Sequence, residues 1–175
     1  NINDVPLAIS AIRGEDLSLL GITDTRDLNK LVPGFTSAES GYNTPIYTLR
    51  GLGFNDATYT ATSTVGVYVD EISLPYSIMT KGANVDIERV EVVKGPQGIL
   101  YGRNTTAGAI NYITRKPTDS FEGGLRASYG SYDRSSLEVY VSDGLSDTVS
   151  GRLAFRVDHS SKGWQESVTR KGDYL

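Results

Sequence analysis

Alternating acidic and cationic side chains in the middle of the chain are the first candidates for chemistry. Asp86, Glu88 and Glu91 could act as a general acid and base or bind a metal ion, because carboxylates do both. Arg89 alternates with them along a strand-like stretch, which favours charge pairing within a sheet. The lone His159 has no cysteine or second histidine at ligand spacing. We therefore predict no catalytic residue, no metal ligand and no cofactor.

A run of glycines follows, and glycine-rich loops can bind phosphate groups. A phosphate loop needs Gly-Lys-Ser or Gly-Lys-Thr at the start of a helix, whereas Gly-Arg-Asn stands here before a strand-like segment. The better interpretation is structural, because Pro96 presets a turn and glycine permits backbone paths closed to other residues. We expect positive φ, or a Cα with no room for a side chain, in at least one of Gly95, Gly98 and Gly102.

Length and composition limit the classes of protein to consider. The chain has 175 residues, a net charge of −4 and no cysteine. A nucleic-acid partner is not expected, because such proteins usually present a basic face. No segment approaches the roughly 18 apolar residues of a membrane-spanning helix, so a membrane role would have to use strands.

Residues 1 to about 117 mix short strands, helical turns and glycine-rich loops, which is an α+β pattern with a small sheet. A short helix is expected at 15–20, ended by Gly21. A second helix, with Thr23 as its cap, carries an apolar stripe that ends at Val32. The predicted strands are 5–12, 46–49, 65–69, 87–93 and 109–113.

Polar and apolar residues alternate beyond Pro117, which marks a natural boundary because proline cannot donate to a sheet. Strands with this pattern form the walls of transmembrane barrels, but also amphipathic sheets of soluble proteins. The alternation alone does not distinguish a barrel wall from a soluble sheet, because a charged face suits a wet lumen and open solvent equally. The expected strands are 125–129, 137–141 and 152–158, and the expected turns are 132–134 and 143–147.

The segment from Asp86 to Asn111 resembles the signature of TonB-dependent receptor plug domains along its whole length. Other segments resemble the family in the same order along the chain, so the resemblance covers essentially the whole sequence. It also favours the barrel interpretation of the alternating strands. The further matching segments are 5–9, 15–17, 28–34, 49–53, 65–70, 113–117, 145–147 and 152–155.

This resemblance implies an α+β plug domain (small mixed sheet with short helices) at residues 1–117, followed at residues 118–175 by the first antiparallel strands of a transmembrane β-barrel. Such plugs fill barrels of about 22 strands in the outer membrane of Gram-negative bacteria. The implied function is active transport of a scarce nutrient, most often an iron–siderophore complex. The implied partners are outer-membrane lipid, the nutrient ligand, and the energy-coupling protein TonB, which would bind a segment upstream of Asn1.

The resemblance also points to charged residues that could hold a plug in its barrel. By position, Arg50, Arg89 and Lys94 are candidates for pairing with acidic residues of the wall, with Glu91 as a local partner. Pairing of Arg89 and Glu91 with their neighbours on the sheet is the alternative. Lys94 departs from the family, where arginine is commoner. Glu71 stands where glycine is usual, which predicts a tight or strained turn.

Loops rich in tyrosine and asparagine are candidate contacts with the nutrient, and loop packing against the barrel is the alternative. Aromatic rings and amides suit catecholates, hydroxamates, cobalamin and oligosaccharides alike, so they select no substrate. An enzyme, which no motif supports, and a plug-like interaction or signalling module without transport are the other classes of function. The candidate contacts are Tyr42, Asn43, Phe54, Asn55, Tyr59 and Tyr76.

Overall fold

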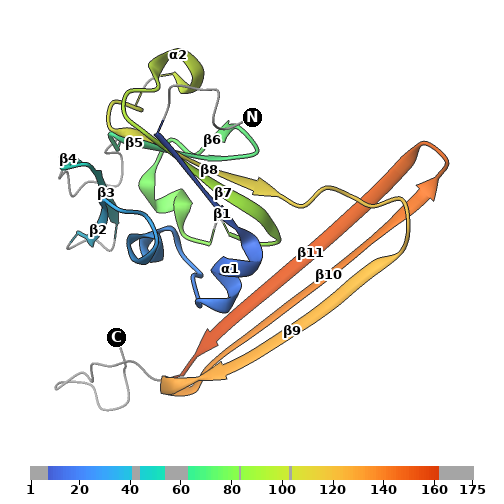
Figure 1. Ribbon diagram of the computed structural model, residues 1–175. Helices are drawn as coiled ribbons and strands as arrows, with labels where there is room; N and C mark the ends of the chain where they lie inside the picture. The colour runs from blue at the N-terminus through green and yellow to red at the C-terminus, as the bar shows by residue number, and fades with distance from the viewer. Residues whose placement is uncertain (1–7, 41–43, 54–62, 83, 103, 162–175) are drawn as a thin grey trace. The chain divides into compact units, whose positions relative to one another are not determined.

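The computed structural model describes residues 8–40, 44–53, 63–82, 84–102 and 104–161. The chain forms two compact units, Asn1–Arg115 and Lys116–Leu175, called the first and second unit below (Figure 1). No helix in these described ranges is long and apolar enough to cross a membrane.

The first unit is built on a five-stranded sheet with the strand order β1-β7-β8-β5-β6. β5 runs parallel to β8, and the other neighbours are antiparallel, so the small mixed sheet expected from the sequence is confirmed. These strands are β1 (Ala8–Arg13), β5 (Val65–Val69), β6 (Ile72–Ser73), β7 (Ile87–Lys94) and β8 (Gly108–Thr114).

A second sheet of the first unit has three strands in the order β2-β3-β4. They are β2 (Phe35–Glu39), β3 (Pro45–Leu49) and β4 (Leu52–Gly53). β2 was not predicted, because one aromatic residue followed by Thr, Ser, Ala and Glu lacks the apolar alternation of a half-buried strand. Its pairing with β3 from Phe35–Leu49 to Glu39–Pro45 supplies what the local sequence lacks.

Short helices connect the strands of the first unit. They are α1 (Gly14–Leu19), α2 (Gly98–Tyr101) and two 3-10 turns, η2 (Thr25–Lys30) and η3 (Ser77–Thr80). α1 ends before Gly21, as predicted, and that glycine has φ of +65°.

The predicted cap of the second helix is wrong. Asp24, not Thr23, precedes η2 with extended backbone, and its Oδ1 accepts a hydrogen bond from the backbone N–H of Arg26 at 2.9 Å. Aspartate ranks above threonine at this position because its carboxylate accepts from the helix's free N–H groups more strongly. Thr23 instead donates its backbone N–H to Asp27 at 3.3 Å.

The core of the first unit lies where β7 and β8 pack against η2 and the second sheet. Val90, Val92 and Ile110 are fully buried at the centre of the sheet. Burying each such side chain stabilises the fold by roughly 1.5–3 kcal/mol. The apolar stripe predicted around η2 is confirmed, because Leu28 and Val32 are buried in this core. The other members are Leu17, Ile22, Phe35, Tyr47, Leu49, Val65, Val67, Ile87, Ala107 and Tyr112.

The second unit is an antiparallel sheet with the order β11-β10-β9. Its strands are β9 (Glu122–Gly130), β10 (Arg134–Ser146) and β11 (Val149–Ser160), and a 3-10 turn at Ser131–Asp133 joins the first two. The turn predicted at 143–147 is wrong, because β10 continues through Ser146 and the chain turns at residues 147–148. Turn-forming residues stay in the strand there because β11 pairs with them.

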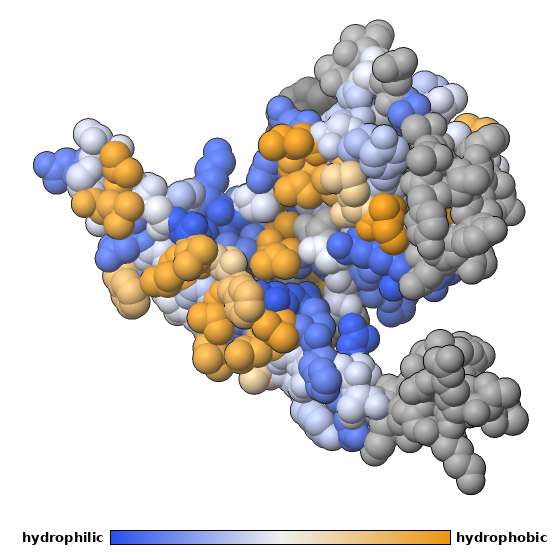
Figure 2. Space-filling view, turned by 180° about the vertical axis from the view of Figure 1, so that it is seen from behind, coloured by the Kyte–Doolittle hydropathy of each residue, from blue (hydrophilic) through white to orange (hydrophobic). Residues whose placement is uncertain are grey.

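The alternation predicted for these strands is confirmed by their register. On one face, Val139 lies between Leu125 and Phe155, and both outer side chains are exposed. On the other face, Glu138 lies between Arg126 and Arg156. We call these the apolar face and the charged face of the second unit. Figure 2 shows apolar residues gathered in a band over this sheet.

The hairpin between β5 and β6 offers a test of backbone strain. Its turn residues, Asp70 and Glu71, have φ of +47° and +68°, which confirms the strain expected at Glu71. Left-handed backbone costs a residue other than glycine roughly 1–2 kcal/mol. Glu71→Gly should therefore stabilise residues 1–117 by about 1 kcal/mol, after the greater chain entropy of unfolded glycine is subtracted. The measurement is the free energy of unfolding in urea.

Asp70→Gly is the matched control in the same turn. It relieves similar strain but removes a carboxylate that accepts from the backbone N–H of Thr114 at 2.9 Å and from its hydroxyl at 2.7 Å. This variant should be less stable than Glu71→Gly. If Glu71→Gly lowered the free energy of unfolding, positive φ at Glu71 would not be destabilising.

Candidate functional site

A chain of buried hydroxyl groups joins four elements of the first unit. Tyr112 on β8 donates to Thr25 Oγ1 on η2 at 2.8 Å, and Thr25 donates to the carbonyl of Thr80 on η3 at 3.3 Å. Tyr47 on β3 bonds the Thr80 hydroxyl, which donates to the carbonyl of Ser77 at 2.7 Å. Tyr112, Thr25, Tyr47 and Thr80 are each 1% exposed. We call this set the polar junction.

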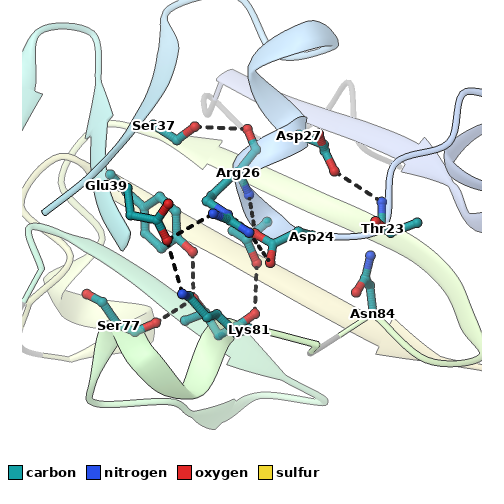
Figure 3. A network of polar contacts seen from close by, with 12 residues as sticks. Thr23, Asp24, Arg26, Asp27, Ser37, Glu39, Ser77, Lys81 and Asn84 are labelled. Carbon is teal, nitrogen blue, oxygen red and sulfur yellow. Dashed lines mark hydrogen bonds and ion pairs between the residues drawn. The ribbon is translucent and has the colours of Figure 1, made fainter. Parts of the chain in front are cut away.

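Charged side chains form a rim beside the polar junction (Figure 3). Arg26 on η2 bonds Asp24 at 3.0 Å and Glu39 at the end of β2 at 3.0 Å. Lys81, which follows η3, reaches the same Glu39 oxygen at 3.1 Å. These groups are partly exposed, so each pair contributes at most about 1 kcal/mol. The rim therefore aligns η2, β2 and η3 without locking them together.

Burial keeps the tyrosines of the polar junction neutral. It raises the pKa of Tyr47 to about 12, while the hydrogen bond between Tyr47 and Thr80 lowers that pKa. It raises the pKa of Tyr112 further, for the same reason. These phenols act as hydrogen-bond donors at physiological pH and do not act as bases or nucleophiles. The arrangement can hold elements together, and it provides no group for covalent chemistry.

A cavity of about 20 Å³ lies next to the polar junction, lined in part by Tyr47, Thr80, Val67 and Leu74. A volume of this size holds about one water molecule. It is far too small for a metal chelate or a sugar. In the ranges that the structure describes, no cluster of three acidic or histidine side chains is placed to hold a metal ion.

The expectation that at least one of Gly95, Gly98 and Gly102 has positive φ is confirmed. Gly95 has φ of +104° and Gly102 has φ of +74°, both closed to most side chains. Gly98 departs from the pattern, because it begins the short helix α2 and its Cα faces open space. Pro96 stands between the two bends, where the backbone N–H of Gly95 donates to Ala107 at 2.9 Å.

The structure places the charged candidates separately. Arg89 pairs with Glu88 at 2.6 Å and with Glu91 at 2.8 Å, so Glu91 is a local partner of Arg89 within β7. Arg50 is exposed, with φ of +53°, and forms no ion pair with another described residue. Lys94 is half-buried at the end of β7. Pairing of Arg50, Arg89 or Lys94 with a barrel wall stays a prediction.

Most candidate ligand contacts lie outside the described residues. These are Tyr42, Asn43, Phe54, Asn55 and Tyr59. Tyr76 immediately precedes η3 and is 44% exposed. Ile78 and Met79 on η3 are also exposed, so this stretch presents apolar side chains beside the tyrosine.

The first unit matches a known protein family. The family described as TonB-dependent Receptor Plug Domain matches residues 1–109. The chain belongs to this family. The plug domain that the resemblance implied is thereby confirmed, and the first unit is called the plug below.

Relatives and solved structures extend the match into the second unit. An iron-regulated outer membrane virulence protein of Vibrio cholerae is 33% identical over 167 residues, which cover 85% of this chain and 24% of the relative. The pesticin receptor of Yersinia pestis is 30% identical over 140 residues, covering 78% of this chain and 20% of the receptor. The crystal structure of the ferric yersiniabactin uptake receptor from Yersinia pestis has a TM-score of 0.86 at 26% identity, covering 97% of this chain and 26% of that one. The chain thus spans about a quarter of the length of these relatives.

Sequence reasoning missed the polar junction. Thr25 and Thr80 carry no periodic signal, because threonine in a loop-like stretch normally marks a cap or turn. Tyr47 and Tyr112 alternate correctly in their strands, but a tyrosine in a strand shows only that one side is buried. No local pattern reveals that residues 25, 47, 80 and 112 meet.

The raised pKa of Tyr47 predicts alkaline sensitivity of the plug. The pKa of a tyrosine is ordinarily 10.0, and the fold raises the pKa of Tyr47 to about 12. The folded state therefore holds this proton more tightly, and the stability that the neutral phenol contributes is complete below pH 10 and is lost as the pH rises toward 12. The free energy of unfolding of residues 1–117 should fall across that window. Tyr47→Phe should reduce the fall by on the order of 2 kcal/mol.

Tyr76→Phe is the control, because Tyr76 is an exposed tyrosine outside the polar junction. It should leave the pH dependence unchanged. The same dependence in Tyr47→Phe and in the unaltered plug would contradict the role assigned to the Tyr47 hydroxyl.

Proposed function

We propose that this chain is part of an outer-membrane receptor that imports an iron–siderophore complex with energy supplied through TonB. Residues 1–117 are its plug, and residues 118–175 are the first strands of its barrel wall, in the outer membrane of a Gram-negative bacterium. The family match over residues 1–109 carries this proposal. Relatives described as a ferripyoverdine receptor and a ferric yersiniabactin uptake receptor support iron chelates as the cargo.

The second unit supports the assignment to a barrel wall. Its apolar face has Leu125, Phe155 and Leu153 exposed by 71%, 60% and 71%, where a soluble sheet would bury such residues. Its charged face carries ion pairs, such as Arg156 with Asp158 at 2.9 Å. A transmembrane barrel with a wet lumen needs this division, with the apolar face toward outer-membrane lipid.

The plug supports a gating role. Its rim and strand surfaces carry partly exposed ion pairs, which are weak individually and break without a large free-energy cost. A surface of this kind suits a domain that must fill a lumen and then be moved by TonB, which acts through a segment upstream of Asn1. Arg50, Arg89 and Lys94 are the proposed contacts with the wall, and Tyr76 is a proposed contact with the chelate.

Growth and uptake measurements test the cargo. A strain lacking the full-length receptor should fail to grow on one iron–siderophore complex as sole iron source, while growth on cobalamin-dependent medium and on oligosaccharides stays normal. Restoring the full-length gene should restore growth. Unimpaired growth on every iron complex together with a defect on cobalamin or a sugar would contradict the proposed cargo.

A charge placed on the apolar face tests the lipid contact. In the full-length receptor, Phe155→Arg should reduce the free energy of folding into bilayers by about 2–4 kcal/mol, because a cation near the midplane is costly in lipid. Arg156→Leu on the charged face is the matched neighbour and should have a smaller effect.

Spin labels distinguish a barrel wall from a soluble sheet. Labels at positions 153, 155 and 157 should report lipid, and labels at 152 and 156 should report water. The reverse pattern would refute the assignment of residues 118–175 to a barrel wall.

A further inference from the structure

The segment that joins the two units is bound to the second unit at a defined place. Pro117 has no N–H, so Thr118 is the first residue after it with a backbone donor. That donor bonds Ser142 Oγ on β10 at 2.8 Å, and the hydroxyl oxygens of Thr118 and Ser142 are 3.0 Å apart. Ser142 is 1% exposed and donates to the carbonyl of Gly151 at 3.2 Å. The Ser142 hydroxyl thus donates one hydrogen bond and accepts one from the Thr118 backbone, and the Thr118 hydroxyl lies within hydrogen-bond distance of it.

A glycine two residues along β10 makes room for the same segment. A Cβ on Gly144 would lie 2.6 Å from the carbonyl oxygen of Asp119 and 3.3 Å from its carbon. Backbone atoms cannot yield at that distance, so Asp119 rests there because residue 144 has no side chain. Gly144 and Ser142 lie on the charged face of β10, and both pair across to β11. Two independent features therefore hold residues 118–119 on this face.

A buried arginine, Arg152, lies beside the contact between Thr118 and Ser142 and is held by an ion pair and by an aromatic ring. Ser142 lies opposite Arg152 in the sheet, and the Arg152 side chain is only 5% exposed. The guanidinium stacks over Tyr140 at 4.4 Å and pairs with Glu122 at 3.6 Å. Moving Glu122 or Tyr140 would remove one of the groups that stabilise this buried cation, so the contact resists rearrangement.

We infer that Ser142 and Gly144 are positioning residues for transport, which keep residues 118–119 docked on the wall throughout the transport cycle. This inference rests on the proposed function. With the junction segment held, the plug is displaced or remodelled upstream of Thr118, and the segment itself is an anchor rather than a hinge. Any pulling force applied to the plug is then transmitted to the wall at residues 118–119.

A reversible crosslink tests the anchor in the full-length receptor. The chain has no cysteine, so Thr118→Cys with Ser142→Cys introduces a single designed pair into it. Because the two hydroxyl oxygens are 3.0 Å apart, sulfurs at these places can form a disulfide with small shifts. The probe is radioactive iron bound to pyoverdine or yersiniabactin, whichever supports growth of the strain. Oxidised and reduced receptor should take it up at the same rate.

Each outcome of this experiment is decisive. Loss of uptake on oxidation, restored by dithiothreitol, would show that the segment undocks and would overturn the anchor. Failure of the disulfide to form, judged by a maleimide gel shift, would overturn the docking itself. If the reduced and unaltered receptors both fail to import any iron chelate, the proposed function fails, and docking is decided by a second measurement.

That second measurement is hydrogen exchange in the full-length receptor. Gly144→Ala should displace Asp119, break the bond from Thr118 to Ser142, and speed exchange of the Thr118 amide by on the order of tenfold. Gly130→Ala on β9 is the control, because a Cβ there meets no atom within 4 Å. It should leave the exchange unchanged. Unaltered exchange in Gly144→Ala would overturn the docking of residues 118–119.

Discussion

The architecture of the plug depends on the requirement that a hydroxyl group buried in a protein core finds a hydrogen-bond partner. Tyr112 lies on the middle strand of the sheet with its hydroxyl in the core, and this hydroxyl donates a hydrogen bond to Thr25. Thr80 in turn satisfies Tyr47. Loss of one member leaves another unpaired, at a cost of about 1–3 kcal/mol. The polar junction thus fixes two short 3-10 turns that have too few residues to be stable alone.

The two units differ in where they place their apolar side chains. The plug buries its apolar side chains around β7 and β8, as a water-soluble domain does. The second unit exposes Leu125 and Phe155 and gathers its charges on the other face. In the receptor that we propose, this contrast would keep the wall in lipid and let the plug move in a water-filled lumen.

Much of this arrangement could be predicted from the sequence, where local pattern and tertiary environment agree. The β-branched stretches at β5, β7 and β8 became strands, and the alternation beyond Pro117 became two distinct faces. Predictions failed where long-range pairing overrode local preference, as at residues 143–146, which β11 keeps in a strand. The polar junction could not be predicted, because its hydroxyls come from four segments far apart in the chain.

We propose above that this plug belongs to a receptor that imports an iron chelate with energy from TonB. The most direct measurement compares binding and uptake of a radioactive ferric siderophore by cells that express the full-length receptor, with and without TonB. We expect equal binding in both strains and accumulation inside the cell only where TonB is present. Equal accumulation in the two strains, or no binding in either, would contradict it.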